Sequence, residues 1–182
     1  MKPNVKLRKI SLFDTENIIR WRNNPSVKKN LYSQEDLTVE QHLAHMNRNV
    51  FNGKSIQYII FVEELSKSYD IGTVFIKNIN YDKKEGEFGI FIGEDSARGK
   101  GFSFFATNEM LRIAFEEFSL NKVFLSVMSN NTVAIKTYRK VGFVEYDIKK
   151  EELVRFDQNC DTIKMVITKE AWIHLQENYR EN

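Results

Sequence analysis

A short, basic, glycine-rich loop at residues 97–103 constrains the fold of this chain more than any other segment. Residues 86–92 before it are mostly apolar and β-favouring, which predicts a buried strand. Apolar residues recur at helical spacing over 102–118, which predicts a helix. A glycine turn between strand and helix leaves N–H groups unpaired at the positive end of the helix dipole. Because Arg98 and Lys100 add full charges, the loop predicts a site for a phosphorylated cofactor.

The loop differs from two common phosphate-binding motifs. A Walker A loop has its second glycine five residues after the first, but Arg98 stands five residues after Gly93. A dinucleotide-binding loop has a third glycine where Phe104 stands here. An ordinary tight turn with two solvated basic residues is the alternative that the loop alone leaves open.

The length and composition predict one domain over residues 1–182 with a core that needs neither disulfides nor metal. The net charge of +2 argues against nucleic-acid binding, and no apolar run is long enough to predict a membrane span. Cys160, the single cysteine, excludes an internal disulfide and fits a reducing cytoplasm. It and the three histidines lack zinc-site spacing, so we expect no metal. His42 and His45 are interpreted as ordinary surface or core residues.

Strand and helix patterns alternate along the whole chain without a repeat or a linker, which predicts an α+β fold. The expected strands cover 5–10, 57–62, 71–79, 87–92, 122–128, 143–148 and 162–167, and the expected helices 15–22, 39–50, 102–118, 131–141 and 170–179. Thr38 and Gln41 form a capping box for the second helix, whose expected apolar face consists of Val39, Leu43, Met46 and Val50.

Two motifs in this order resemble the Gcn5-related N-acetyltransferase (GNAT) superfamily. The segment Arg98-Gly99-Lys100-Gly101-Phe102-Ser103 is similar to the acetyl-CoA loop Arg/Gln-x-x-Gly-x-Gly/Ala, with Ser103 in place of the last small residue. The pattern Asn-x-x-Ala-x-x-x-Tyr-x-x-x-Gly-Phe is complete over 131–143. The resemblance covers nearly the whole chain and implies the GNAT fold, a mixed seven-stranded sheet flanked by helices. It also implies acetyl-CoA as co-substrate and a central strand pair that separates to admit pantetheine.

A finer resemblance lies near the start of the chain. Trp21-Arg22-Asn23-Asn24-Pro25 and residues 37–43 are similar to the amino-terminal helices of the nucleotide-amino-sugar acetyltransferases of the pseudaminic acid pathway. These belong with the ribosomal-protein-alanine acetyltransferases to one larger group of similar layout. The resemblance implies a primary amine as acceptor and direct attack on the thioester.

The two motifs assign a cofactor site and a proton donor. The expected cofactor-binding residues are Ile90, Phe91, Ile92, Arg98, Gly99, Lys100, Gly101, Phe102, Ser103 and Asn131. Tyr138 is the expected general acid, because a phenol with a pKa near ~10 can reprotonate the coenzyme A thiolate. The alternative for Tyr138 is a core tyrosine beneath its helix.

Glu87 is the expected general base, acting directly or through a water, because it is a carboxylate within an otherwise apolar strand. The alternative is an outward-facing strand residue, since neighbours in a strand point to opposite faces. Backbone N–H groups of the same strand can bind the oxyanion.

The acceptor pocket is expected around Trp21, Arg22, Asn23 and Tyr32, because an arginine beside aromatic rings can hold a diphosphate and a base. An amphipathic helix with Trp21 buried and Arg22 solvated is the alternative. A nucleotide-linked amino sugar is the expected acceptor. The alternatives are a protein N-terminus, a polyamine, an antibiotic, or a non-catalytic acyl-CoA sensor. A homodimer is a further expectation.

Overall fold

Seven strands form one mixed sheet in the part of the chain that this computed structural model describes, residues 4–64, 67–155 and 158–180. The strands are β1 (Asn4–Lys9), β2 (Ile56–Glu63), β3 (Ser68–Asn80), β4 (Glu85–Ile92), β5 (Lys122–Met128), β6 (Val144–Arg155) and β7 (Gln158–Thr168). Their order is β1-β2-β3-β4-β5-β7-β6. The β4–β5 pair is parallel and the other pairs are antiparallel. The predicted GNAT-type sheet is confirmed.

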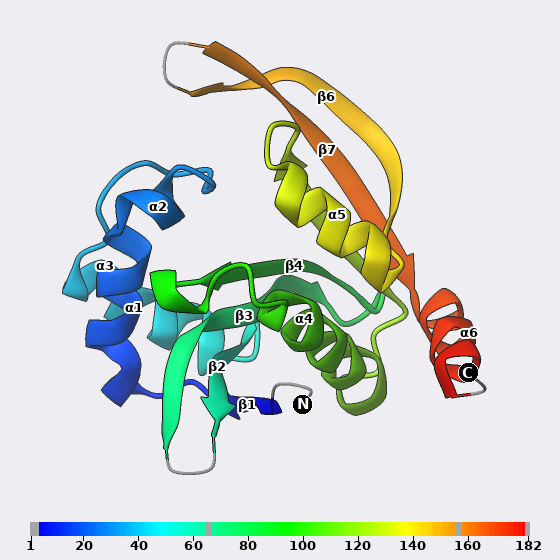
Figure 1. The fold of residues 1–182 in the computed structure, drawn as a ribbon, viewed down its shortest axis with the longest axis horizontal. Coiled ribbons are helices and arrows are strands. Elements are labelled where there is room, and N and C mark those ends of the chain that lie inside the picture. Colours follow the sequence, from blue (N-terminus) through cyan, green and yellow to red (C-terminus); the bar gives the residue numbers. More distant parts are fainter. Residues whose placement is uncertain (1–3, 65–66, 156–157, 181–182) are drawn as a thin grey trace.

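Helices cover both faces of the sheet (Figure 1). They are α1 (Thr15–Asn23), α2 (Pro25–Lys28), α3 (Val39–His45), α4 (Phe102–Arg112), α5 (Thr132–Val141) and α6 (Lys169–Arg180), with short helical turns at η1 (Leu12–Asp14), η2 (Met46–Val50), η3 (Asp95–Ala97) and η4 (Ile113–Glu117). The main core joins the sheet to α4, α5 and α6. A smaller core joins the other face to α1 and η2 through Trp21, Met46 and Ile59. Among the described residues, no helix is long and apolar enough to cross a membrane.

The second helix starts where the sequence predicts but turns a different face inward. Thr38 accepts from the Gln41 N–H at 3.3 Å and the Gln41 side chain accepts from Thr38, so the capping box is confirmed. The expected apolar face is wrong at Val39, which is 48% exposed, whereas His42 is buried and Met46 fully so. The physical reason is that the buried face follows His42 and Met46, which lie four residues apart on one side of the helix, and Val39 is the first residue of α3.

Candidate active site

The candidate active site is a cleft of about 570 Å³ that opens where β4 and β5 separate. Their pairing covers only Glu85–Glu87 of β4 against Lys122–Phe124 of β5. Beyond Glu87 the two strands diverge, as the resemblance implies for pantetheine. Of the residues predicted for the site, the cleft wall includes Arg22, Tyr32, Glu87, Ile90, Phe91, Ile92, Arg98, Gly99, Gly101, Phe102, Ser103, Asn131 and Tyr138. Trp21, Asn23 and Lys100 are not part of that wall.

The glycine loop joins β4 to α4 with two residues in the left-handed region. Gly99 has φ 72° and Gly101, the N-cap of α4, has φ 78°. A Cβ at either position would meet no atom within 4 Å, so both glycines border open space. Left-handed glycines before a helix turn successive N–H groups toward one concavity, which suits a phosphate.

The side chain of Arg98 makes its contacts within the protein. Its Nε and Nη2 donate to the Ile92 carbonyl at 3.1 and 3.0 Å, and its Nη1 lies 2.6 Å from a carboxylate oxygen of Asp95. The carbonyl at the end of β4 is available because β5 has already diverged there. Arg98 therefore fixes the loop to the end of β4.

Tyr138 lies on the buried face of α5 and reaches the cleft. The helix begins at Asn131, whose side chain accepts from the Ala134 N–H at 3.3 Å. The Tyr138 ring packs edge-on against Phe88 and Phe143, each with a centroid distance of 5.9 Å. Burial raises the pKa of Tyr138, so the phenol is protonated at neutral pH and is a donor in the cleft.

Glu87 faces the cleft, but its surroundings are not those expected of a desolvated carboxylate. Its side chain is 33% exposed and lies 3.1 Å from the Lys77 ammonium. Asn78 donates to it at 3.0 Å. The expectation of an apolar environment is wrong because the register of β3 and β4 sets Lys77 directly opposite Glu87.

Two cleft residues of β3, Phe75 and Lys77, were missed by the sequence reasoning. A Cβ at Gly89 would lie 2.3 Å from the Phe75 ring, so the ring covers the glycine directly. Phe75 stands opposite Gly89 in the register. Alternation along the two strands indicates which residues share a face, but the cross-strand partners become visible only once the register is known.

Arg22 and Asn23 hold the loop that follows α2, which borders the cleft. Arg22 Nη2 donates to the Ser33 carbonyl at 3.1 Å. Asn23 binds the backbone of Leu37 twice, donating to its carbonyl at 3.0 Å and accepting from its N–H at 2.7 Å. Tyr32, in the same loop, is 43% exposed and lines the cleft. Arg22 thus contacts both loop and cleft, whereas Asn23 acts on the loop.

Trp21 is a core residue rather than a cleft residue. It is 1% exposed, and its ring takes the space beside Gly93, where a Cβ would lie 2.1 Å from it. Its Nε1 donates to Glu94 at 2.6 Å. The apolar ring belongs to the face of α1 that packs on the sheet, so Trp21 fixes α1 against the start of the phosphate loop.

The remaining candidate groups lie outside the cleft. His42 is 2% exposed, and its Nε2 has no hydrogen-bond partner among the described residues. Cys160 is buried beside Ser129, with Sγ and Oγ 4.0 Å apart. In the described part of the chain, no group of three His, Cys, Asp or Glu side chains is arranged to hold a metal.

A mixed sheet that opens between β4 and β5, with a glycine loop beside the opening, defines the class of acyl-CoA-dependent transferases. Residues 4–144 match the family described as acetyltransferase (GNAT) domain, and the chain belongs to that family. It is an acetyl-CoA-dependent N-acetyltransferase.

Known acetyltransferases are similar to most of this chain. The spermidine N(1)-acetyltransferase of Vibrio cholerae is 25% identical over 177 residues, 97% of this chain and 100% of that protein. The acetyltransferase PseH of Campylobacter jejuni is 26% identical over 138 residues, 76% of this chain and 82% of that protein. The crystal structure of the V. cholerae spermidine enzyme with CoA and spermine superimposes with a TM-score of 0.85 at 25% identity, covering 93% of this chain and 98% of that one.

Proposed function

We propose that this enzyme acetylates the primary amine of a nucleotide-linked amino sugar. The observation that carries the proposal is the charge of the cleft. Its described lining residues include three cations, of which Lys77 is paired with Glu87 and Arg98 with Asp95. Arg22 makes no ion pair among the described residues, and its buried Nη1 has no hydrogen-bond partner there. Such a guanidinium attracts the phosphates of a nucleotide acceptor.

A polyamine is the second candidate acceptor, and the full-length similarity to the spermidine enzyme favours it. A polyamine carries several ammonium groups, each of which needs a carboxylate or other acceptor in the site. Glu87 can serve one of them. The guanidinium of Arg22 repels the others, which is why we prefer the nucleotide-linked acceptor.

The proposed chemistry is direct transfer. The acceptor nitrogen forms a bond to the thioester carbon, and the carbon–sulfur bond breaks. Glu87 takes a proton from the amine, directly or through a water, and the acceptor's ammonium competes with Lys77 for that carboxylate. Tyr138 gives its proton to the departing thiolate and is reprotonated from solvent. N–H groups of β4 beyond Glu87, where β5 no longer pairs, stabilise the oxyanion.

Initial-rate kinetics with thiol detection test the acceptor class. The substrates are a uridine-diphosphate-linked 4-amino sugar, spermidine and an alanine-terminated peptide. We expect the highest kcat/KM with the nucleotide sugar. An inert nucleotide sugar with rapid turnover of spermidine or the peptide would show that the acceptor assignment is wrong, while leaving the acetyltransferase activity intact.

Self-association is a separate proposal. Three apolar side chains of β6, Val144, Tyr146 and Ile148, are 61%, 55% and 47% exposed. A structure of the related V. cholerae enzyme is described as dodecameric, with a TM-score of 0.80 at 25% identity over 94% of this chain and 98% of that one. Sedimentation equilibrium of wild type and a Tyr146→Glu variant checks whether β6 joins copies of this chain.

A further inference from the structure

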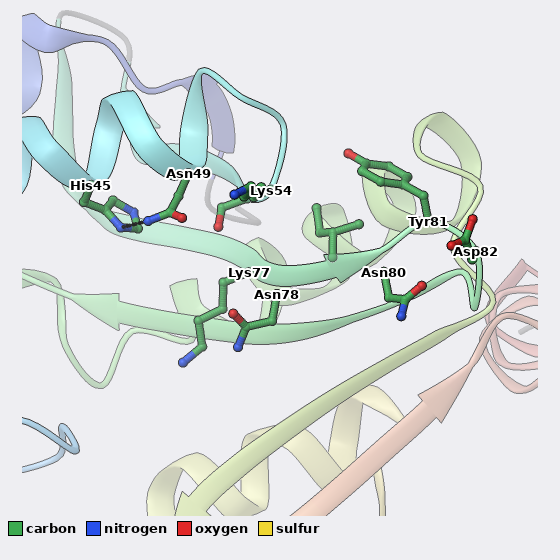
Figure 2. Close-up of a pocket in the computed structure, with 10 residues that line it drawn as sticks. His45, Asn49, Lys54, Lys77, Asn78, Asn80, Tyr81 and Asp82 are labelled. Atoms are coloured by element: carbon green, nitrogen blue, oxygen red, sulfur yellow. Dashed lines mark hydrogen bonds between the residues drawn. The ribbon is translucent and has the colours of Figure 1, made fainter.

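A second cavity, of about 740 Å³, lies at the end of β3 and adjoins the cleft (Figure 2). Side chains of α3, η2 and the following turn meet those of β3 and its hairpin there. Lys77 lines both this cavity and the cleft. The two spaces therefore meet at the ion pair between Lys77 and Glu87.

A bulge in β3 creates this junction. The register shifts between Lys77 and Asn80, and Asn78 there has φ 53°. Asparagine tolerates this left-handed conformation better than most residues. In a regular strand Lys77 and Asn78 would point to opposite faces of the sheet. The bulge allows both side chains to contact Glu87. Bulges of this kind re-aim side chains beside active sites.

The lining groups suit a planar, hydrogen-bonding ring and a phosphate. Asn49, Asn78 and Asn80 supply amides, each able to donate and to accept. Tyr81 is 53% exposed, and its Oη donates to the Gly53 carbonyl at 2.7 Å, which holds the ring in place. A held, exposed aromatic ring is a stacking surface for a base.

The charges of the cavity favour an anion once the acceptor's ammonium has taken the place of Lys77 on Glu87. Lys54 and Lys77 are then its cations, and Asp82 is the one carboxylate among its described lining residues. Burial lowers the pKa of His45, which is thus neutral at pH 7. The lysines lie on the side of the cavity toward the helices and the cleft, and Tyr81 stands farther along β3 (Figure 2).

The length of the combined site fits an extended acceptor. Phe75 lies opposite Gly89, in the cleft, and Asn80 lies opposite Glu85. Their partners in β4, Gly89 and Glu85, are four residues apart, about 13 Å at 3.3 Å per residue, and the bulged β3 spans the same distance with five. A sugar with its amine at the thioester therefore places an attached diphosphate near Lys77 and the nucleoside near Tyr81.

We infer that this second cavity is the distal half of the acceptor site and takes a nucleoside diphosphate. The inference rests on the proposed function and names the residues that recognise its substrate. It assigns the diphosphate to Lys77 and Lys54.

Calorimetric titration of uridine diphosphate into protein saturated with coenzyme A tests the inference, because the coenzyme occupies the phosphate loop. We expect binding to wild type, a loss of about tenfold in Tyr81→Ala, and of about three- to tenfold in Lys54→Met. Tyr81→Phe keeps the stacking ring but loses the hydrogen bond to Gly53, so it should lose less affinity than Tyr81→Ala. Lys9→Met, at an exposed lysine of β1, is the matched control and should change nothing.

The outcomes separate this inference from the proposed function. Turnover of the nucleotide sugar with no uridine diphosphate binding, or with binding that Tyr81→Ala and Lys54→Met leave unchanged, overturns the cavity assignment alone. Loss of affinity in Tyr81→Phe equal to that in Tyr81→Ala overturns the stacking role. No turnover of the nucleotide sugar by wild type overturns the proposed function and this inference together.

Discussion

Replacing Gly101 by alanine should weaken acetyl-CoA binding far more than it weakens the fold. Gly101 has φ 78°, and an L residue in that conformation costs about 1–2 kcal/mol. An added Cβ meets nothing within 4 Å, so no steric clash adds to this cost. For a chain of this length the melting temperature should fall by about 2–8 °C.

The expected effect on the cofactor is larger. Gly101 caps α4 beside the open space of the cleft, where the first N–H groups of the helix meet the phosphates. A charge-assisted hydrogen bond contributes about 1.5–3 kcal/mol, so the loss of one lowers affinity about ten- to hundredfold. Gly101→Val adds two more methyl groups to the same space and should abolish measurable binding.

Gly53→Ala is the matched control, because Gly53 has φ 70° and its Cβ would lie an ordinary 3.7 Å from the Tyr81 hydroxyl. It should lose similar stability and keep wild-type affinity for acetyl-CoA. Calorimetric titration with acetyl-CoA and thermal unfolding give both quantities. Folded Gly101→Ala and Gly101→Val proteins that bind acetyl-CoA like wild type would refute the loop assignment.

Three further predictions concern catalysis, the acceptor loop and pH. Tyr138→Phe should keep acetyl-CoA affinity but reduce turnover about 10²–10⁴-fold in steady-state assays, and unchanged turnover would remove the phenol from the mechanism. Arg22→Ala should raise KM for a nucleotide sugar about ten- to hundredfold and affect KM for a small free amine much less. The reason is that the variant loses a guanidinium bordering the cleft and its hydrogen bond to Ser33. Equal effects on both substrates would contradict this prediction. Burial lowers the pKa of His42 and of His45 below the value near 6.5 that they have in the unfolded chain. Below pH 6.5 the unfolded chain therefore binds more protons than the folded protein. The free energy of unfolding should decrease as pH falls through 6.5. Melting temperatures measured from pH 7.5 to 5.5 should show this loss of stability, and a His42→Asn variant should show less of it. Identical pH profiles for wild type and the variant would exclude His42 as a source of the pH dependence.

Local patterns were enough to predict most elements of the fold. Strand β5 has the predicted bounds, and α5 begins after the predicted Asn131 cap and ends at Gly142, which has φ 111°. Helix α2 was missed because four residues are too few to show a helical period. Strands β6 and β7 extend well past the predicted 143–148 and 162–167, because pairing with each other supplies hydrogen bonds where the apolar alternation stops.

The parts of the candidate site that lie within one contiguous motif were predictable from the sequence. The parts that depend on contacts between two strands were not. The loop at Gly99 and Gly101 and the proton donor Tyr138 follow from contiguous motifs. The partners of Glu87 do not, because Lys77 and Asn78 reach it through a cross-strand register and a bulge. The role of Asn23 is likewise visible only once Leu37, fourteen residues later, folds back onto it.

Strand β4 brings the two substrates together because its side chains alternate between two environments. Phe88 and Ile90 belong to the core with α4 and α5, on the side of Tyr138 and the phosphate loop. Glu87 and Phe91 point the other way, toward Lys77 or the core of α1 and η2. In a fully paired sheet these two sides would be sealed from each other by the backbone. The divergence of β5 after Glu87 opens the strand edge between them, so an amine beside Glu87 can reach a thioester beside Tyr138.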